Sequence, residues 1–411
     1  MKHSMKCLFI VLFSVVFSFS LFANGLNLNS IGSRASSMGT AFIGLSDDFS
    51  AVFFNPAGLT QMKNANLSIF GTALIPTGTY QLDIAGVDAT TESSVYPSGA
   101  ISYFKPISDK LVLGFAIYAP SGIGSKWNGE DLANLTGGVA FEWESMIAVI
   151  TASPGIAYKI TDTFSLGATL NINYGILNTH RPALGQYTEE INGVALGATF
   201  GALFTPSKYF SVGASLRTAS KITFSGDATM AGAPSIGMSA TSEAEREATS
   251  PMVAGIGIAV KPTDKLTFAV DAVFTQWSKL ETIPVTYTDT AWNLAFAPDG
   301  ELDLQWEDTW QFKFGIEYKV SENWCLRAGY YSDPAPGPLE TQNILLPSVD
   351  YSSVTAGFGY RTKKMSLDFA FEYVMGSERD VPLTMLDAMP GIHGMDVLVP
   401  NLTFTIFFGG E

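Results

Sequence analysis

Three basic side chains lie in segments where apolar and polar residues alternate. These are Arg217, Lys313 and Arg327. If the apolar positions of such segments form an outer surface, the three side chains point into an enclosed interior. There, a guanidinium or ammonium group can bind an acidic ligand. The same charges can instead form ion pairs that support the wall, so we predict ligand binding for these residues and leave the structural role open.

The sequence offers little material for catalysis or metal binding. Three His and two Cys in 411 residues leave few ligands for a zinc or iron–sulfur site. His180 and His393 fall in predicted loops, and no Gly-x-Ser-x-Gly motif accompanies them. A net charge of −15 argues against a nucleic-acid partner, because phosphate binding needs a basic surface. We therefore expect neither an enzyme nor a cofactor or metal site.

The N-terminus is typical of a secretory signal peptide. Two lysines precede an apolar run over residues 7–22, and the small residue Ala23 follows. A transmembrane anchor is the alternative, but the run is short for a bilayer core, which needs about 20 apolar residues. We predict a signal peptide over residues 1–23, whose removal would leave Cys325 as the one remaining cysteine.

The rest of the chain is apolar without containing a membrane helix. Charged residues make up 15% of the sequence, against about 25% in an ordinary soluble protein. No later segment has 18 uninterrupted apolar residues. Because only helices and closed barrels satisfy the backbone in lipid, we predict an all-β transmembrane barrel in the bacterial outer membrane.

Short turns alternate with longer polar loops from residue 64 to residue 411, the predicted barrel. The short turns are expected at residues 105–109, 159–162, 205–208, 261–264, 319–323 and 361–364. The longer loops are expected at residues 75–94, 121–144, 176–192, 223–249, 276–304, 333–349 and 376–397. The intervening segments alternate with the period of two that marks a strand. This division gives 14 antiparallel strands, with short turns at one end of the barrel and long loops at the other.

The apolar positions of each strand fix which side faces lipid. With those positions outward, Asp271, Glu317, Asp368 and Glu372 join the three basic residues inside the barrel. The mirror arrangement would place Lys and Arg in lipid at a cost of about 2–4 kcal/mol each near the midplane. We therefore predict a polar interior of mixed charge.

Residues 24–63 do not alternate like strands. They are rich in small residues and contain Asp47 and Asp48, then Asn55, Pro56 and Ala57. A barrel of 14 strands is too wide for its own side chains to fill, so a plug inside it is expected. A disordered tail is the alternative, against which the apolar residues of the segment argue.

This segment resembles the N-terminal hatch of the long-chain fatty acid transporter (FadL) family of outer-membrane proteins. That family also contains channels for toluene and other aromatic hydrocarbons. The resemblance rests on the Asp-rich step followed by Asn-Pro-Ala and extends along the mature chain. Further similar stretches lie at residues 118–122, 153–159 and 326–330.

The resemblance implies passive uptake of a hydrophobic ligand through a lumen site that the hatch blocks below. Asp47, Asp48 and residues 55–57 would be hatch or gating positions. An inward kink of the third strand would open the wall sideways. Pro120, Gly122 and Gly124 are the candidates here, because proline lacks an N–H and glycine tolerates unusual backbone angles. An ordinary loop start is the alternative for these three residues.

We expect long-chain fatty acids as substrates, with aromatic hydrocarbons as the alternative and a general aqueous porin as a weaker one. The sequence does not separate the first two, because both need an apolar pocket. Besides the ligand, the expected partner is outer-membrane lipid, and we expect a monomer. The third loop, residues 176–192, departs from the family because it offers no apolar landing site for a ligand.

Overall fold

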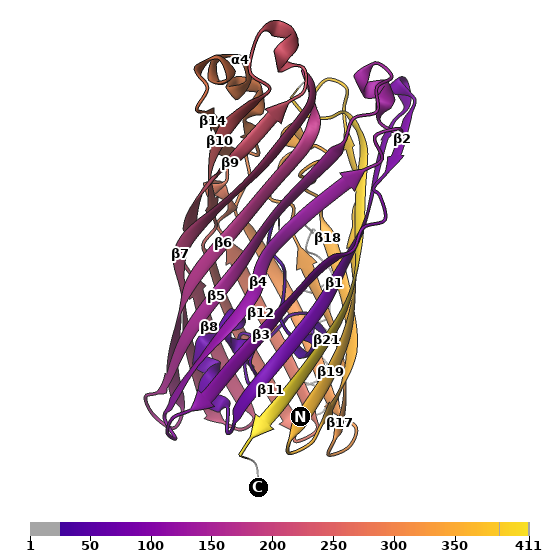
Figure 1. Ribbon diagram of the computed structural model, residues 1–411. Helices are drawn as coiled ribbons and strands as arrows, with labels where there is room; N and C mark the ends of the chain where they lie inside the picture. Colours follow the sequence, from indigo (N-terminus) through magenta and orange to yellow (C-terminus); the bar gives the residue numbers. More distant parts are fainter. Residues whose placement is uncertain (1–24, 386, 410–411) are drawn as a thin grey trace.

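The computed structural model describes residues 25–409 apart from residue 386. The predicted signal peptide, residues 1–23, lies outside these residues. The described chain forms a tall closed barrel (Figure 1), with short turns at one end and longer loops with short helices at the other. We call these the turn end and the loop end.

Within the described residues, 14 strands cross the wall, each antiparallel to its neighbours. In chain order they are β1 (Ala65–Leu82), β3 (Tyr96–Pro106), β4 (Leu111–Trp127), β5 (Trp143–Lys159), β6 (Phe164–Ala183), β7 (Gly185–Ser207), β8 (Phe210–Arg217) continued by β9 (Ser220–Met230), β10 (Thr241–Ser250) continued by β11 (Val253–Thr263), β12 (Leu266–Thr275), β16 (Thr309–Lys319), β17 (Trp324–Asp333), β18 (Tyr351–Arg361), β19 (Met365–Gly376) and β21 (Gly391–Phe408). The barrel closes because β1 pairs with β21, from Ala65 opposite Phe408, as well as with β3. The predicted 14-stranded barrel is confirmed.

Smaller elements decorate the barrel. The short strands are β2 (Val87–Thr90), β14 (Val285–Tyr287) and β20 (Arg379–Val381), which extend the sheet, and β13 (Thr282–Ile283), which pairs with β15 (Leu302–Asp303). The helices are α2 (Ser33–Ser36), α3 (Ala51–Phe54), α4 (Thr290–Gly300), η1 (Pro56–Gln61), η2 (Asp83–Ala85), η3 (Ala133–Thr136), η4 (Ala233–Ile236), η5 (Trp277–Lys279) and η6 (Leu339–Thr341). None of the helices in the described part of the chain is long and apolar enough to cross a membrane.

The strands reach further at the loop end than the sequence indicates. The prediction of a loop over residues 176–192 is wrong, because β6 and β7 continue to a tight turn at Leu184. Similarly, β9 and β10 fill most of the predicted loop 223–249, and β4 continues into the predicted loop 121–144. On the inner faces of the β6, β7, β9 and β10 extensions, apolar side chains pack in a cluster with Trp277 and Trp306, beside the buried Glu189–Arg246 ion pair. Their outer faces are polar, which made the segments read as loops.

The predicted register of the wall is confirmed. Large apolar side chains such as Val194, Leu196 and Ile256 are exposed on the outside. Of the charged side chains predicted to face inward, Arg217 is half-buried and the others are buried, with Asp271 and Glu317 retaining 1% and 4% of their accessible surface.

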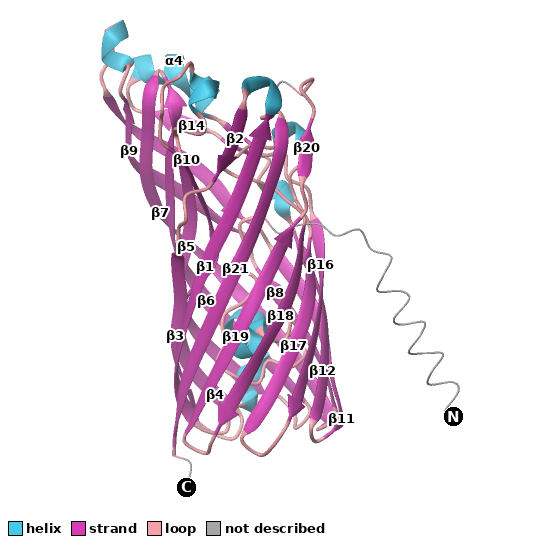
Figure 2. Ribbon diagram, turned by 90° about the vertical axis from the view of Figure 1, so that its right-hand side faces the viewer, coloured by secondary structure: helices cyan, strands magenta, loops and turns pink. Residues whose placement is uncertain are grey.

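Residues 25–62, which we call the N-terminal segment, lie inside the barrel, and their short helices lie toward its turn end (Figure 2). Figure 2 shows their short helices enclosed by the strands. Helix η1 contacts β5, β6 and β7, and α2 contacts β18, β19 and β21. Because the segment touches strands on several sides of the wall, it fills much of the lumen cross-section at this height.

The outward register can be tested at Val270, an exposed residue in the middle of β12. We expect Val270→Arg to destabilise the folded barrel by about 2–4 kcal/mol, because it places a cation on the lipid face. Equilibrium unfolding in lipid vesicles measures this change, with Val270→Leu as the matched apolar control. Equal stability of the two variants would contradict the assigned register.

Candidate functional site

The N-terminal segment is bound to the wall through its own backbone. The Asp271 carboxylate on β12 accepts hydrogen bonds from the amides of Phe42 (2.6 Å) and Ile43 (2.7 Å). The Gly39 amide donates to Thr355 Oγ1 on β18 at 2.9 Å. Such bonds supply partners for buried amides outside regular secondary structure. The segment is therefore attached from at least two sides of the lumen.

The predicted gating residues Asn55, Pro56 and Ala57 form one tight corner. The Asn55 side chain accepts a hydrogen bond from the Ala57 amide at 3.2 Å and so caps η1. Its Nδ2 donates to the carbonyl oxygens of Ile43 (3.0 Å) and Ala202 (2.9 Å), the latter on β7. Pro56 opens η1, where its missing N–H leaves no partner unsatisfied. Asn55 thus joins two parts of the segment to the wall.

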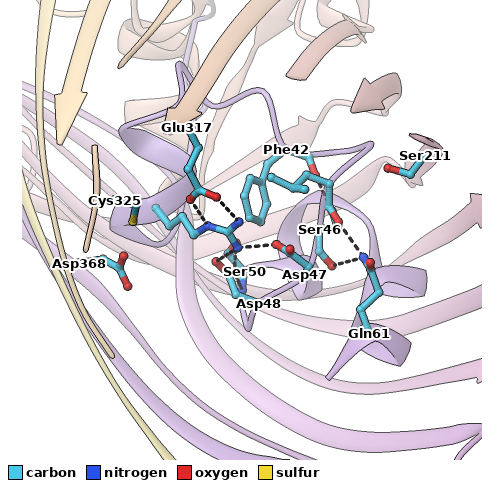
Figure 3. A network of polar contacts seen from close by, with 12 residues as sticks. Phe42, Ser46, Asp47, Asp48, Ser50, Gln61, Ser211, Glu317, Cys325 and Asp368 are labelled. Atoms are coloured by element: carbon cyan, nitrogen blue, oxygen red, sulfur yellow. Dashed lines mark hydrogen bonds and ion pairs between the residues drawn. The ribbon is translucent and has the colours of Figure 1, made fainter. Parts of the chain in front are cut away.

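Asp47 and Asp48 surround Arg34 in a charged network (Figure 3). Arg34 Nη1 contacts Asp47 Oδ1, and Arg34 Nε lies 2.8 Å from Glu317 Oε2 on β16. Asp48 Oδ1 accepts hydrogen bonds from the amide and hydroxyl of Ser50. The network therefore links the segment to the barrel wall by a buried ion pair.

Burial raises the pKa of both aspartates, but the net pKa shift has opposite directions in the two. For Asp47, burial raises the pKa, and the charges of Arg34 and Lys261 outweigh it, so that the pKa is lowered. For Asp48, burial raises the pKa and Arg34, at 3.9 Å, offsets this only in part. Asp47 is therefore the main carboxylate partner of Arg34 within the segment.

Arg327, one of the three candidate ligand-binding residues, belongs to this same network. Its Nε lies 2.7 Å from Glu317 Oε2, and its Nη1 lies 2.8 Å from Asp368 Oδ1. It lines a cavity of about 950 Å³ at the turn end, together with Arg34 and Asp47. With two carboxylate partners, its charge is already neutralised by the wall.

A second cavity, of about 480 Å³, lies in the lumen on the loop-end side of the segment, and we call it the lumen cavity. Its apolar lining includes Leu74, Tyr96, Ile117, Met146, Val349 and Met395. A few polar groups converge on it, among them Asn29, Asp333 and Glu372. A largely apolar cavity of this size with few polar groups is typical of a small-molecule site.

The wall beside the lumen cavity is interrupted. β3 and β4 pair from Pro106 opposite Val112 up to Ala100 opposite Tyr118. Beyond that point, the next backbone hydrogen bond between the two edges of the described chain runs from the Glu92 amide to the Lys126 carbonyl at 2.7 Å, beside the bridge between Thr91 and Trp127. We call the unpaired stretch between these points the ladder gap. Residues from both of its edges line the lumen cavity, namely residues 96–99 on one edge and Ser121, Gly122 and Gly124 on the other.

The predicted lateral-opening residues lie at the ladder gap. The pairing of β4 with β5 shifts register between Tyr118 and Ser121, so Pro120 lies in a bulge. Gly122 and Gly124 follow it on the edge that faces the cavity. The sequence pattern of a proline followed by two glycines therefore marks the place where pairing with β3 ends.

The start of the N-terminal segment covers the inside of this edge. The Leu28 amide donates to the Pro120 carbonyl, and the Gly122 amide donates to the Leu26 carbonyl, both at 3.0 Å. Asn27 lies opposite Ser121 as an antiparallel bridge. Residues 26–28 thus act as a short extra strand that replaces β3 along part of the gap.

Arg217 and Lys313, the other two candidate ligand-binding residues, line the same small cavity of about 50 Å³. Asn27, Leu28 and Asn29 line both this cavity and the lumen cavity, so the two adjoin. Lys313 faces Asp271 across the β12–β16 pairing, which gives its charge a nearby carboxylate. The structure thus brings together two of the three basic candidates, and Arg327 is in the turn-end network instead.

Arg217 contacts Phe53 of the N-terminal segment and keeps one guanidinium donor without a partner. Its guanidinium stacks on the Phe53 ring, 4.4 Å from the centroid, and Nη2 donates to the Phe53 carbonyl at 3.2 Å. Its Nε is buried without a hydrogen-bond partner. A buried, unpaired cationic donor is costly unless a ligand or water completes it.

Sequence reasoning missed the role of residues 334–350, which we call the mouth loop. This loop crosses from β17 to the opposite wall, where Ser125 and Trp127 of β4 donate to the Ile344 carbonyl at 3.0 and 2.9 Å. Near the end of the loop, Arg379 Nη1 donates a hydrogen bond to the Ser348 carbonyl at 2.6 Å. The loop therefore covers the lumen cavity from the loop end. Its proline-rich sequence signalled a rigid loop but not the direction in which it folds.

Among the described residues, no group of three or more His, Cys, Asp or Glu side chains is arranged to hold a metal ion.

The buried network at Glu317 can be tested by Glu317→Gln. Because Arg34 and Arg327 each keep one other carboxylate, we expect a loss near the lower end of the range for broken buried pairs, about 3 kcal/mol. Denaturant unfolding of the barrel in vesicles measures it. Asp264→Asn, which removes the exposed pair with Lys208, is the control and should leave the unfolding midpoint unchanged.

Comparisons with known proteins agree with this architecture. The family model described as "Outer membrane protein transport protein (OMPP1/FadL/TodX)" matches residues 14–394. A putative outer membrane protein of Neisseria meningitidis, NMB0088, is 27% identical over 120 residues. That match covers 26% of this chain and 25% of the relative, so it spans about a quarter of the relative's length.

Solved structures share the fold over nearly the whole chain. A Pseudomonas aeruginosa FadL homologue has a TM-score of 0.78 at 18% identity, covering 94% of this chain and all of that one. The Pseudomonas putida toluene transporter TodX has a TM-score of 0.74 at 17% identity, with coverage of 94% and 100%. The Ralstonia pickettii toluene transporter TbuX has a TM-score of 0.72 at 16% identity, with coverage of 93% and 100%.

The family match extends over most of the sequence, and its members are transport channels rather than enzymes. The chain therefore belongs to the OMPP1/FadL/TodX family, the outer-membrane β-barrel channels for hydrophobic substrates.

Proposed function

We propose that this channel takes up long-chain fatty acids passively, through the lumen cavity and out sideways through the ladder gap. The observation that carries the proposal is that the cavity reaches the gap. Residues 96–99 on one unpaired edge of the wall, and Ser121, Gly122 and Gly124 on the other, also line the cavity. A ligand in the cavity therefore lies next to the one part of the β3–β4 pair that has no hydrogen-bonded ladder.

The N-terminal segment acts in this proposal as a hatch that closes the direct route to the turn end. Two buried contacts with the wall support this role. They are the hydrogen bond from Asn55 to the Ala202 carbonyl of β7 and the Arg34–Glu317 ion pair. Pro56 and Ala57 fix the corner that Asn55 begins, and Asp47 and Asp48 hold Arg34 in place. With this route closed, sideways release is the shorter path for an apolar ligand.

The contacts of Arg217 support the proposal that the substrate is acidic. Its Nε is an unused donor in a cavity that adjoins the apolar one. A fatty acid could place its carboxylate there and its tail in the lumen cavity. Among the three basic candidates, Arg327 suits this role least, because Glu317 and Asp368 already bind it.

Release is the difficult step for such a substrate. A buried methylene gains about 0.8 kcal/mol, so a tail of about 16 carbons gains on the order of 12 kcal/mol before ordering costs. An opening in the wall lowers this barrier, because the tail can pass from cavity to lipid without crossing water. Outer-membrane lipid is then the acceptor, and a single barrel is sufficient.

Aromatic hydrocarbons are the alternative substrates, because the lumen cavity is lined mainly by apolar residues that would suit them as well. They carry no carboxylate, so Arg217 distinguishes the two classes. A general aqueous porin is disfavoured by the buried N-terminal segment and by the mouth loop, both of which lie across the lumen.

Uptake of a labelled long-chain fatty acid by cells that lack their own transporter tests the substrate class. We expect Arg217→Gln to reduce fatty-acid uptake strongly and Arg217→Lys to retain part of it, because only a cation attracts the carboxylate. Toluene uptake is measured in parallel with the same variants. Toluene uptake without fatty-acid uptake in the unmodified protein would favour the hydrocarbon alternative.

Deleting Pro120 tests the sideways route. Two residues of β4, Ala119 and Pro120, lie opposite the single residue Ile150 of β5, so the deletion restores one-to-one pairing and straightens β4. We expect lower uptake with normal membrane insertion, because β4 can then pair further with β3. Pro120→Ala keeps the bulge and serves as the control. Undiminished uptake after the deletion would count against sideways release.

A further inference from the structure

Six glycines face the N-terminal segment from three pairs of neighbouring strands. Gly167 of β6 lies opposite Gly201 of β7, Gly213 of β8 opposite Gly257 of β11, and Gly315 of β16 opposite Gly329 of β17. We call these six residues the glycine belt. Glycine weakens a strand relative to alanine, so paired glycines in a barrel wall need another explanation.

That explanation is lack of space. A Cβ at Gly201 would lie 2.8 Å from Pro56 Cδ and 2.9 Å from the Ala57 nitrogen. At Gly257 it would lie 2.6 Å from the Gly44 nitrogen, a distance that Cβ atoms do not adopt. At the belt, the backbone of the segment therefore lies directly against the backbone of the wall.

The same holds further along the wall, where β12 separates β11 from β16. A Cβ at Gly315 would lie 2.8 Å from Met38 Cβ, and one at Gly329 would lie 2.5 Å from Gly39 Cα. The segment thus lies against an arc of belt glycines that extends from β6 to β17.

Polar anchors are found beside the belt. Asp271, which binds the amides of Phe42 and Ile43, is the cross-strand neighbour of Gly257. Ala202, which accepts from Asn55, directly follows Gly201. Ser211 Oγ donates to the Gly44 carbonyl at 2.6 Å, two residues from Gly213. The close approach at the glycines brings the backbone of the segment within reach of these short bonds.

The side of the lumen near the ladder gap is built differently. There, Ile31, Phe49 and Val52 of the segment pack in a cluster with bulky wall side chains. The wall members of the cluster include Phe70, Phe104 and Tyr118. Side chains of this kind can repack, whereas backbone against backbone cannot. The contacts of the segment are therefore rigid at the belt and more adaptable beside the gap.

We propose that the belt glycines are positioning residues that seat the N-terminal segment as a rigid body and keep the lumen closed to ions. This inference rests on the proposed hatch role. A single added methyl group at the belt displaces the backbone of the segment and opens a path for ions past it. The barrel itself tolerates the methyl group, because alanine suits a strand better than glycine.

Ion conductance in planar bilayers tests whether the belt glycines position the segment. Gly201→Ala on β7 and Gly329→Ala on β17 each add one methyl group, at two separate places on the belt. The matched control is Gly197→Ala, on the same strand and face as Gly201, where the nearest atom to the new Cβ is Thr218 Oγ1 at 3.4 Å. We expect steady conductance several-fold above that of the unmodified protein in both belt variants, and unchanged conductance in the control.

A second readout follows the segment itself. Ala51, fully buried in the segment, is replaced by cysteine in a chain whose own cysteines are serine, and a water-soluble maleimide is added. We expect the maleimide to label the cysteine at position 51 slowly when the wall is unmodified or carries Gly197→Ala, and faster in the belt variants. Heat-dependent migration in gels shows whether each barrel has formed.

The outcomes separate the two proposals. Large conductance in the unmodified protein would overturn the hatch role. Low conductance and slow labelling in both belt variants would overturn the proposal that the belt glycines position the segment, and would leave the hatch role intact. The proposal for the belt would also be overturned if none of the belt variants Gly201→Ala, Gly329→Ala and Gly315→Ala formed a barrel while Gly197→Ala did. The glycines would then be needed for the wall itself.

Discussion

The wall of this barrel lies in lipid, where a backbone N–H or C=O finds no partner outside the protein. Closure between β1 and β21 meets that requirement around the circumference. The ladder gap is the exception, and its chemistry reduces the cost. Pro120 has no N–H to satisfy, its carbonyl accepts from Leu28, and the Gly122 amide donates to Leu26. An opening in the wall is thus tolerated because the N-terminal segment supplies backbone partners from inside.

The same segment also organises the charges of the interior. Glu317, Arg327 and Asp368 neutralise one another on the wall, and Arg34 adds the segment to that network. Asp271 is used by the backbone amides of the segment. Arg217 is left with a stacked ring, one carbonyl and a free Nε. In the described interior, Arg217 therefore keeps a cationic donor without a carboxylate contact, in a small cavity that adjoins the apolar one.

The sequence was most informative where one physical pattern dominates. Alternation with a period of two predicted the 14 strands, and the cost of cations in lipid predicted which charges face inward. The strand extensions around Leu184 were missed because they pack on one face only and are polar on the other. The partners of Arg327 and the fold of the mouth loop depend on strands far apart in sequence. The glycine belt is invisible in any single strand, where each glycine reads as a weak point. Its meaning emerges only when the strands stand side by side around the segment.

The closing pair, Ala65 opposite Phe408, joins the first strand of the wall to the last. The N-terminal segment is synthesised before any of these strands, yet it ends up enclosed by all of them. Its backbone fits the belt so tightly that a finished barrel leaves no room to thread it in afterwards. Assembly therefore has an order: the two edge strands stay apart until the segment is seated, and the cellular machinery that inserts the protein releases a barrel already closed around the segment.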